Sequence, residues 1–473
     1  MSVNLNIKDL TSDKINNIIS ELTFFPFDER QELLKKRGIK KNTTPKDPIQ
    51  MFVTNKENNT INVPYQFGKL LTGNKKINHK STHAKVFEDV EFAVSLRDHQ
   101  IPICEEALDH LNKYKTTTLG VYPSCGKTVM GSYLSYIKGY LPMVLLTLTT
   151  LQPSWLETFK MCFPSLANRI WVVGERDSPW KTSSNISDFP SLIICMKGRV
   201  NQIPEYIREK IGTLLVDEAH LFCTEDGVLP LLAISPRYII LETATLDRAD
   251  KMERMVQSMA GNHIISLKDP REFTVYIIKT YVTGTEEKNK RGDLDAGKLY
   301  QSLSNSEYRN GIILNLLESN SEEKFITLSK YVNHVNKLCE LFTENGIEND
   351  SLCGNKKEYL DSFALVGTMP KIKTGFDEKM ACKTYRGTPS NVLVLCDSTP
   401  TWQVLIQSIG RIMRSDNPIV VLFKDQNGMV QNHIRKSKKF INEETNGKII
   451  EMDYTPGIKL SLKKKKKSRL DVK

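Results

Sequence analysis

The residues best suited to carry out chemistry lie in the stretch 121–128, V-Y-P-S-C-G-K-T. It follows a short apolar run, 118–121, and precedes 129–137, whose apolar residues have helical spacing. Strand, tight loop and helix in this order are the setting of a phosphate-binding loop, where backbone N–H groups and the helix dipole attract anions. We therefore expect Lys127 to reach the β- and γ-phosphates of a nucleotide and the Thr128 hydroxyl to hold Mg²⁺.

A second candidate stands about 90 residues further on, in L-L-V-D-E-A-H at 214–220. Asp217 and Glu218 follow an apolar strand, and the carboxyl ends of parallel strands lie where a phosphate-binding loop also opens. Asp217 is placed to hold Mg²⁺, and Glu218 to orient and deprotonate an attacking water. A strand that simply ends in a charged turn is the structural alternative.

A third cluster is Q-S-I-G-R-I-M-R at 407–414. Arg411 and Arg414 are three residues apart, so we expect them to share a helix face with Gln407 nearby. Two arginines offered to a γ-phosphate would stabilise the charge of its transfer. The alternative is an ordinary basic helix face.

The elements that position these residues form two series of apolar, β-branched runs. The first comprises 143–148, 169–173, 191–195, 213–217 and 238–241; the second comprises 274–278, 324–328, 363–366, 391–396 and 418–423. Continuous apolar runs suit parallel strands buried on both faces, and helical segments lie between them. The sequence therefore predicts an α/β protein with two tandem RecA-like parallel-sheet domains.

The expected organisation has four parts. Residues 1–85, rich in Lys and Asn, form an accessory module with a capped helix after Thr11 and a strand at 60–67. Residues 86–269 form the first RecA-like, ATP-binding domain and residues 270–455 the second. Residues 456–473 form a basic tail, in which Lys463–Lys467 is either a solvated end or a tether for nucleic acid.

Composition narrows the class of protein. The formal net charge of +11 fits a partner that is a polyanion. Nine cysteines without C-x-x-C spacing indicate a reducing compartment and no zinc site. No stretch is apolar enough for a membrane span and no leader is visible, so we expect an intracellular protein without a membrane partner.

With these motifs in order, the chain resembles the superfamily 2 helicases and translocases of the DEAD/DEAH type over about residues 94–424. Three further motifs carry the resemblance. They are L-R-D-H-Q at 96–100, similar to L-R-x-x-Q; T-A-T at 243–245; and T-G-F-D at 374–377, similar to T-x-G-x-D. Val121 replaces the first glycine of the phosphate-binding loop, and Glu242 replaces the residue that usually precedes T-A-T.

The resemblance implies roles for individual residues. ATP and Mg²⁺ are the expected cofactors, with Thr128 and Asp217 on the metal and ATP held between the two domains. The nucleotide-binding residues would be Arg97, Gln100, Pro123, Ser124, Cys125, Gly126, Lys127 and Thr128. The catalytic residues would be Lys127, Asp217, Glu218, Gln407, Arg411 and Arg414. Residues that couple hydrolysis to strand movement would be His220, Thr243, Thr245, Thr374, Gly375 and Asp377.

Within the superfamily, the organisation is similar to that of helicases from large cytoplasmic DNA viruses, with poxvirus DNA helicases of transcript release nearest. This implies a monomeric motor that acts on DNA rather than RNA, in transcription or in DNA repair and recombination. The transcription machinery would then be a partner, and the host cytoplasm or the virion the location. The alternatives are an ATP-gated clamp or assembly factor, or an RNA helicase. A P-loop kinase would leave the second domain and its arginines unexplained.

Overall fold

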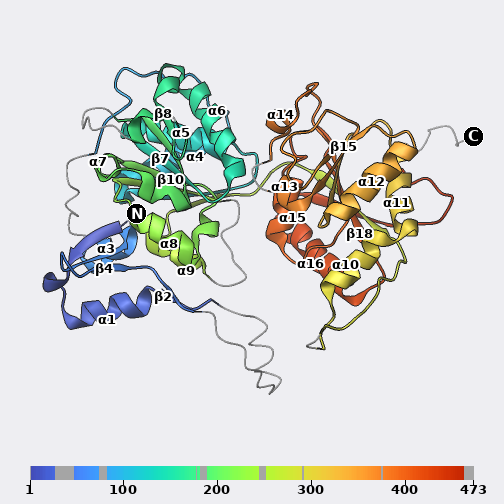
Figure 1. Ribbon diagram of the computed structural model, residues 1–473, viewed down its shortest axis with the longest axis horizontal. Coiled ribbons are helices and arrows are strands. Elements are labelled where there is room, and N and C mark those ends of the chain that lie inside the picture. The colour runs from blue at the N-terminus through green and yellow to red at the C-terminus, as the bar shows by residue number, and fades with distance from the viewer. Residues whose placement is uncertain are drawn as a thin grey trace, which may run out of the picture. The chain divides into compact units, whose positions relative to one another are not determined.

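The computed structural model describes residues 2–26, 47–73, 83–176, 178–181, 189–243, 252–289, 292–373 and 376–462. The chain divides into two compact units, Met1–Leu267 and Lys268–Lys473 (Figure 1). Each unit is built on a seven-stranded parallel sheet, which confirms the predicted fold class. Of the candidate residues, Thr245, Thr374, Gly375 and Lys463–Lys467 lie outside the described ranges. No helix within these ranges has the length and apolar character needed to cross a bilayer.

The first unit begins with a small antiparallel part. Its elements are β1 (Ser2–Asn6), α1 (Ser12–Glu21), β2 (Thr23–Phe24), β3 (Ile49–Gln50), β4 (Val53–Asn55), β5 (Thr60–Pro64) and α3 (Tyr65–Leu71). The Thr11 hydroxyl accepts a hydrogen bond from the Lys14 N–H and caps α1, as expected. The predicted strand at 60–67 is too long. β5 ends at Pro64 because its partner β1 begins at Ser2, and the chain then enters α3.

The central sheet of the first unit has the order β12-β6-β11-β10-β7-β9-β8. Its strands are β6 (Thr116–Val121), β7 (Pro142–Leu146), β8 (Ile170–Val172), β9 (Leu192–Met196), β10 (Thr213–Val216), β11 (Tyr238–Glu242) and β12 (Ile264–Leu267). The helices are α4 (Ile101–Tyr114), α5 (Lys127–Lys138), α6 (Gln152–Cys162), α7 (Glu205–Arg208), α8 (Glu225–Leu232) and α9 (Glu253–Ala260).

Both faces of this sheet are buried, which explains the continuous apolar runs. On β10, Leu215 packs into a cluster with α4, α5 and α6. Its neighbours Leu214 and Val216 point to the other face and pack with α7, α8, α9 and the small antiparallel part. The N-terminal residues therefore share a core with the central sheet, and apolar side chains at successive positions are all removed from water.

The second unit has the sheet order β15-β16-β14-β17-β18-β13-β19. Its strands are β13 (Phe273–Lys279), β14 (Phe325–Ser329), β15 (Asn349–Leu352), β16 (Ala364–Thr368), β17 (Val392–Leu395), β18 (Ile419–Lys424) and β19 (Gly447–Asp453). Its helices are α10 (Ala296–Asn305), α11 (Glu307–Glu318), α12 (Val332–Glu344), α13 (Met369–Lys373), α14 (Glu378–Ala381), α15 (Trp402–Ile409) and α16 (Gly428–Glu444). The edge strands β15 and β19 are only partly buried, and neither has the continuous apolar sequence that predicts a buried strand.

The segment after β19 is packed against the second unit as far as Leu462. Leu460 and Leu462 are buried in the same cluster as residues of α11 and α12. The Asn320 side chain donates to the Leu460 carbonyl at 2.7 Å and accepts from the Leu462 N–H at 2.8 Å. The prediction of a free tail from residue 456 is therefore wrong for its first part, because two leucines there bury apolar surface.

Truncation tests this anchoring. Removal of residues 463–473 should leave the thermal unfolding midpoint unchanged. Removal of residues 458–473 deletes the buried Leu460 and Leu462, and burial of each contributes about 2 kcal/mol to the free energy of unfolding. It also removes two hydrogen-bond partners of the buried Asn320 amide, which keeps its bond to the Leu316 carbonyl. Urea unfolding should show a loss of roughly 3–5 kcal/mol for the longer truncation only; equal stability of the two truncated chains would contradict the anchoring.

Candidate nucleotide-binding site

The loop between β6 and α5 has the backbone of a phosphate-binding loop. Gly126 caps α5 with φ +91°, and a Cβ placed on it would lie 2.2 Å from Gln100 Nε2. Ser124 is also left-handed, with φ +67°. Only glycine meets both demands at position 126, a positive φ and contact with a neighbouring side chain. The loop thus delivers the chain directly into the N-terminus of a twelve-residue helix.

Gln100 supports this loop from the helix in front of it. The side chain is 2% exposed, and its Nε2 donates to the Cys125 carbonyl at 2.9 Å. Its Oε1 accepts from the Arg97 N–H at 2.9 Å, and His99 Nε2 lies 3.3 Å from the same Cys125 carbonyl. The structure brings Gln100 to the loop, whereas Arg97 is exposed, and nucleotide binding by these two residues stays a prediction.

Lys127 is the first residue of α5, and its ammonium group turns back to the end of β6. It donates to the carbonyls of Val121 at 3.2 Å and Tyr122 at 3.5 Å. Thr128 follows it in the first turn of the helix. Both side chains therefore stand at the carboxyl edge of the sheet, where the helix N-terminus favours an anion.

Asp217 lies at the same edge, directly after β10. It is 7% exposed, and Trp155 of α6 donates its indole N–H to Asp217 Oδ2 at 2.8 Å. Burial and the neighbouring Glu218 raise the pKa of Asp217 to about 6, opposed by the Trp155 hydrogen bond and by Lys127. Trp155 is a functional neighbour that sequence reasoning missed, because its position on a helix gives no signal that it would meet Asp217.

Glu218 and His220 connect this motif to the next one. Glu218 has a left-handed backbone, φ +51°, at the start of a 3₁₀ turn, Ala219–Phe222. His220 Nδ1 lies 3.4 Å from Glu218 Oε2 and 2.9 Å from the Thr243 hydroxyl. The structure therefore brings Glu218 and His220 of one motif together with Thr243 of another.

Glu242 adds a third carboxylate that sequence reasoning noted only as a departure from the motif. It ends β11, the strand between β6 and β10, and is fully buried. Neither carboxylate oxygen has a hydrogen-bond partner in the described part of the chain. Burial and the negative charge of Asp217 raise the pKa of Glu242 well above its usual value, opposed by Lys127.

In the second unit, the arginine motif contacts the loop that precedes α14. An Arg411 Nη1 donates to the Phe376 carbonyl, and Arg414 Nη1 lies 2.8 Å from Asp377 Oδ2. The predicted shared helix face is wrong, because α15 ends at Ile409 and both arginines follow in tight i→i−3 turns. Gln407 is within α15 and buried. Asp377 also caps α14 through the Lys379 N–H.

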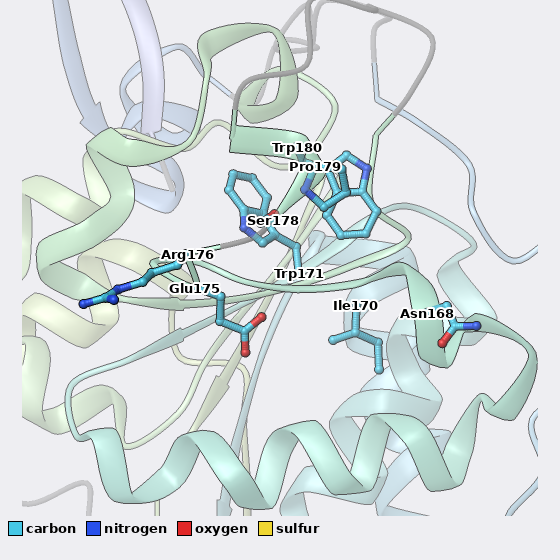
Figure 2. Close-up of a pocket in the computed structure, with 8 residues that line it drawn as sticks. All are labelled: Asn168, Ile170, Trp171, Glu175, Arg176, Ser178, Pro179 and Trp180. Atoms are coloured by element: carbon cyan, nitrogen blue, oxygen red, sulfur yellow. The ribbon is translucent and has the colours of Figure 1, made fainter.

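One described cavity is not part of this site. It has a volume of about 500 Å³ and lies around β8, with Trp171 and Trp180 on its wall (Figure 2). β8 is the strand at the far edge of the sheet, separated from β6 by β9, β7, β10 and β11.

No protein-family model matches the chain. It is 25% identical over 435 residues to "Putative helicase 161L" of Invertebrate iridescent virus 6, covering 86% of this chain and 93% of that protein. It is 25% identical to "Putative helicase 055L" of Frog virus 3, covering 78% and 82%. It is 22% identical to "Putative ATP-dependent RNA helicase L396" of Acanthamoeba polyphaga mimivirus, covering 92% and 84%.

The fold is also that of a solved helicase. Dbp5 of S. cerevisiae, bound to RNA and ADP BeF3, superposes with a TM-score of 0.52 at 15% identity, covering 74% of this chain and 89% of that one. The chain therefore resembles superfamily 2 helicases. Its relatives include proteins of large DNA viruses, as predicted.

The relatives support a helicase-type function with use of ATP. The described residues fit a magnesium nucleotide. A phosphate group would be held by the left-handed Gly126, the helix start at Lys127 and the hydroxyl of Thr128. Asp217 has one carboxylate oxygen that accepts a hydrogen bond from Trp155, and its other oxygen could bind the metal ion.

Substitution of Glu242 tests its electrostatic environment. A carboxyl group with a higher pKa when folded binds more protons in the folded chain, so the free energy of unfolding falls as pH rises above its unfolded pKa. Glu242→Gln cannot ionise and should show a smaller fall between about pH 5 and about pH 8. Urea unfolding without Mg²⁺ and nucleotide measures this. Glu205→Gln, at an exposed position of α7, is the control and should follow the original chain. A parallel pH profile for Glu242→Gln would contradict the assignment.

Proposed function

We propose that this helicase is an ATP-driven motor that translocates on DNA, and that the edge formed by β6, β11 and β10 is its hydrolytic site. The observation that carries the proposal is the meeting of Lys127, Asp217 and Glu218 at the ends of closely spaced parallel strands. Phosphoryl transfer needs positioned charge more than covalent chemistry, and this edge supplies a cation and two carboxylates.

Each residue then has one task. Lys127 binds the phosphates, and Thr128 and Asp217 hold Mg²⁺, which supplies neutralisation of the phosphate charge. Trp155 fixes the orientation of Asp217 through its 2.8 Å hydrogen bond. Glu218 accepts a proton from the attacking water.

The link from Glu218 to the rest of the unit runs through His220. Its ring stands within reach of both the Glu218 carboxylate and the Thr243 hydroxyl. A change at the γ-phosphate that moves Glu218 would therefore be felt at the end of β11. Thr243, with the Thr245, Thr374, Gly375 and Asp377 positions, is proposed to couple hydrolysis to movement of the strand.

Glu218→Gln isolates the proposed base. The amide keeps the size of the side chain but not its basicity, so ATP binding should persist while steady-state hydrolysis falls on the order of 10²-fold or more. Nucleotide affinity is measured by fluorescence titration and turnover by phosphate release. Lys127→Ala should weaken both. Undiminished turnover in Glu218→Gln would remove this residue from the mechanism.

Arg411 and Arg414 are proposed to stabilise the charge of the transferred phosphoryl group. Removal of such an arginine costs on the order of 10³-fold in kcat, so Arg411→Gln should lose turnover with ATP affinity little changed. Because Arg411 also bonds the Phe376 carbonyl, thermal unfolding should be recorded in parallel. Arg435→Gln on α16, exposed at the surface, is the matched control. Normal kcat in Arg411→Gln would assign the motif to structure alone.

The choice of DNA rests on the resemblance of 96–100 to L-R-x-x-Q and on relatives from DNA viruses. The naming of the mimivirus relative as an RNA helicase supports the alternative of an RNA substrate. ATPase rates measured side by side without nucleic acid, with single-stranded DNA, with duplex DNA and with RNA decide between them. Stimulation by RNA alone would overturn the DNA assignment, and absence of any stimulation would favour a nucleotide-gated clamp.

The wider role we propose is in viral transcription, as a monomeric factor of transcript release that works beside the transcription machinery, or in DNA repair and recombination. The setting would be the cytoplasm of the infected cell or the virion. The support is the origin of the relatives in iridoviruses and a mimivirus.

A further inference from the structure

The opposite edge of the first sheet gathers positive charge. Lys115 directly precedes β6, Arg237 directly precedes β11, and Lys138 and Tyr140 come just before β7. These strands are parallel, so their amino ends share one edge, remote from the edge that carries Lys127 and Asp217.

The three cations all contact the ring of Tyr140 or Tyr238. Lys115 Nζ and Lys138 Nζ lie 5.4 Å and 5.3 Å from the centre of the Tyr238 ring. Arg237 Cζ lies 5.2 Å from the Tyr140 ring, and its Nη1 donates to the Tyr140 hydroxyl at 2.7 Å. The two ring centres are 6.0 Å apart. The three charges therefore surround one pair of rings.

The charges are held but not neutralised. A cation over a ring face is attracted by the ring and keeps its full charge. Within the described part of the chain, none of the three forms an ion pair with a carboxylate. Burial and the charges of Arg237 and Lys69 lower the pKa of Lys115, and burial and Lys115 lower the pKa of Lys138. An anion placed here would relieve this repulsion.

Helix dipoles account for only part of the pattern. Lys115 caps the carboxyl end of α4 and Lys138 is the last residue of α5, where cations are favoured. The two helix ends together carry about one negative elementary charge, against three positive ones. Arg237 lies at the start of a strand and has no helix end to explain it.

The charged surface continues along the sheet edge. Lys113 lies 5.0 Å from the Tyr114 ring, which stacks on His263 at 3.6 Å just before β12. Glu106, more than half exposed, lies 4.0 Å from His110. From β12 to β7 the row crosses five neighbouring strands, about 19 Å at the usual spacing. That matches about five to six nucleotides of one strand of a duplex.

We propose that this edge, centred on Lys115, Lys138 and Arg237, is a second nucleic-acid surface that binds the sugar-phosphate backbone away from the motor site. A row of fixed cations suits a linear polyanion, and cations held by ring faces bind phosphates without reading bases, so binding is independent of sequence. The inference rests on the proposed nucleic-acid substrate but on none of the assigned catalytic residues.

Charge removal at the three positions tests it. Lys115→Gln, Lys138→Gln and Arg237→Gln are combined, and affinity for an oligonucleotide of about 30 nucleotides, single-stranded or duplex, is measured against salt. Loss of three phosphate contacts should reduce the slope of log affinity against log salt by about 2 on a single strand and about 2.7 on a duplex. ATP hydrolysis at saturating nucleic acid should stay unchanged.

The matched control removes three exposed lysines from the N-terminal part, as Lys8→Gln, Lys14→Gln and Lys56→Gln. It loses the same charge and should keep the original slope. Lys138→Gln alone, with about a third of the effect, guards against misfolding of the triple variant, and thermal unfolding is recorded for each. Equal slopes in the triple variant and the control would overturn the proposal, and so would loss of saturated ATP hydrolysis in a folded triple variant. A failure of the motor proposal itself would show instead as absence of nucleic-acid binding in the original chain.

Discussion

The parallel pairing of β6, β11 and β10 is the constraint on which the candidate site depends. Glu242 pairs in register with Leu119, and Val216 with Leu241, so the three strands end at nearly the same level. The end of each strand carries a residue of the site: the loop of Lys127 after β6, Glu242 on β11 and Asp217 after β10. A shift of one register step would move a carboxylate away from the phosphate-binding loop, although each motif would still be present in the sequence.

This arrangement places like charges close together in a buried setting, which the fold tolerates only with help. Asp217 receives a hydrogen bond from Trp155, and Lys127 is the cation that lowers the pKa of both Asp217 and Glu242. Burial of a carboxylate favours its protonated form, which raises the pKa of both Asp217 and Glu242. Bound cations at this place reverse that preference, since a metal ion is the largest local charge in such a site. The same residues therefore favour the binding of a cation at this edge.

The sequence predicts the parts of the molecule whose signal is local. The runs that correspond to β7, β10 and β11 are mostly apolar because both faces of the sheet are covered, and their limits agree with the structure to within two residues. The edge strands β15 and β19 were missed, because a half-exposed strand need not be apolar. The sequence assigns Leu460 and Leu462 to the tail, because two leucines beside a lysine run do not show that they pack against α11 and α12. Trp155 escaped notice because its contact with Asp217 spans 62 residues.

The two edges of the first sheet show how one architecture can supply two kinds of binding surface. In a doubly wound fold, helices run antiparallel to the strands, so helix amino ends gather at one edge and helix carboxyl ends at the other. At the first edge, the start of α5 favours phosphates, and the carboxyl groups of Asp217 and Glu242 lie near Lys127. At the second edge, the ends of α4 and α5 favour lysines. The rings of Tyr140 and Tyr238 contact these lysines and Arg237, and the three positive charges exceed the negative charge of the two helix ends. The helix carboxyl ends at this edge thus explain part of its positive charge. The positive charge that exceeds the charge of the helix ends is the reason to propose an anionic partner.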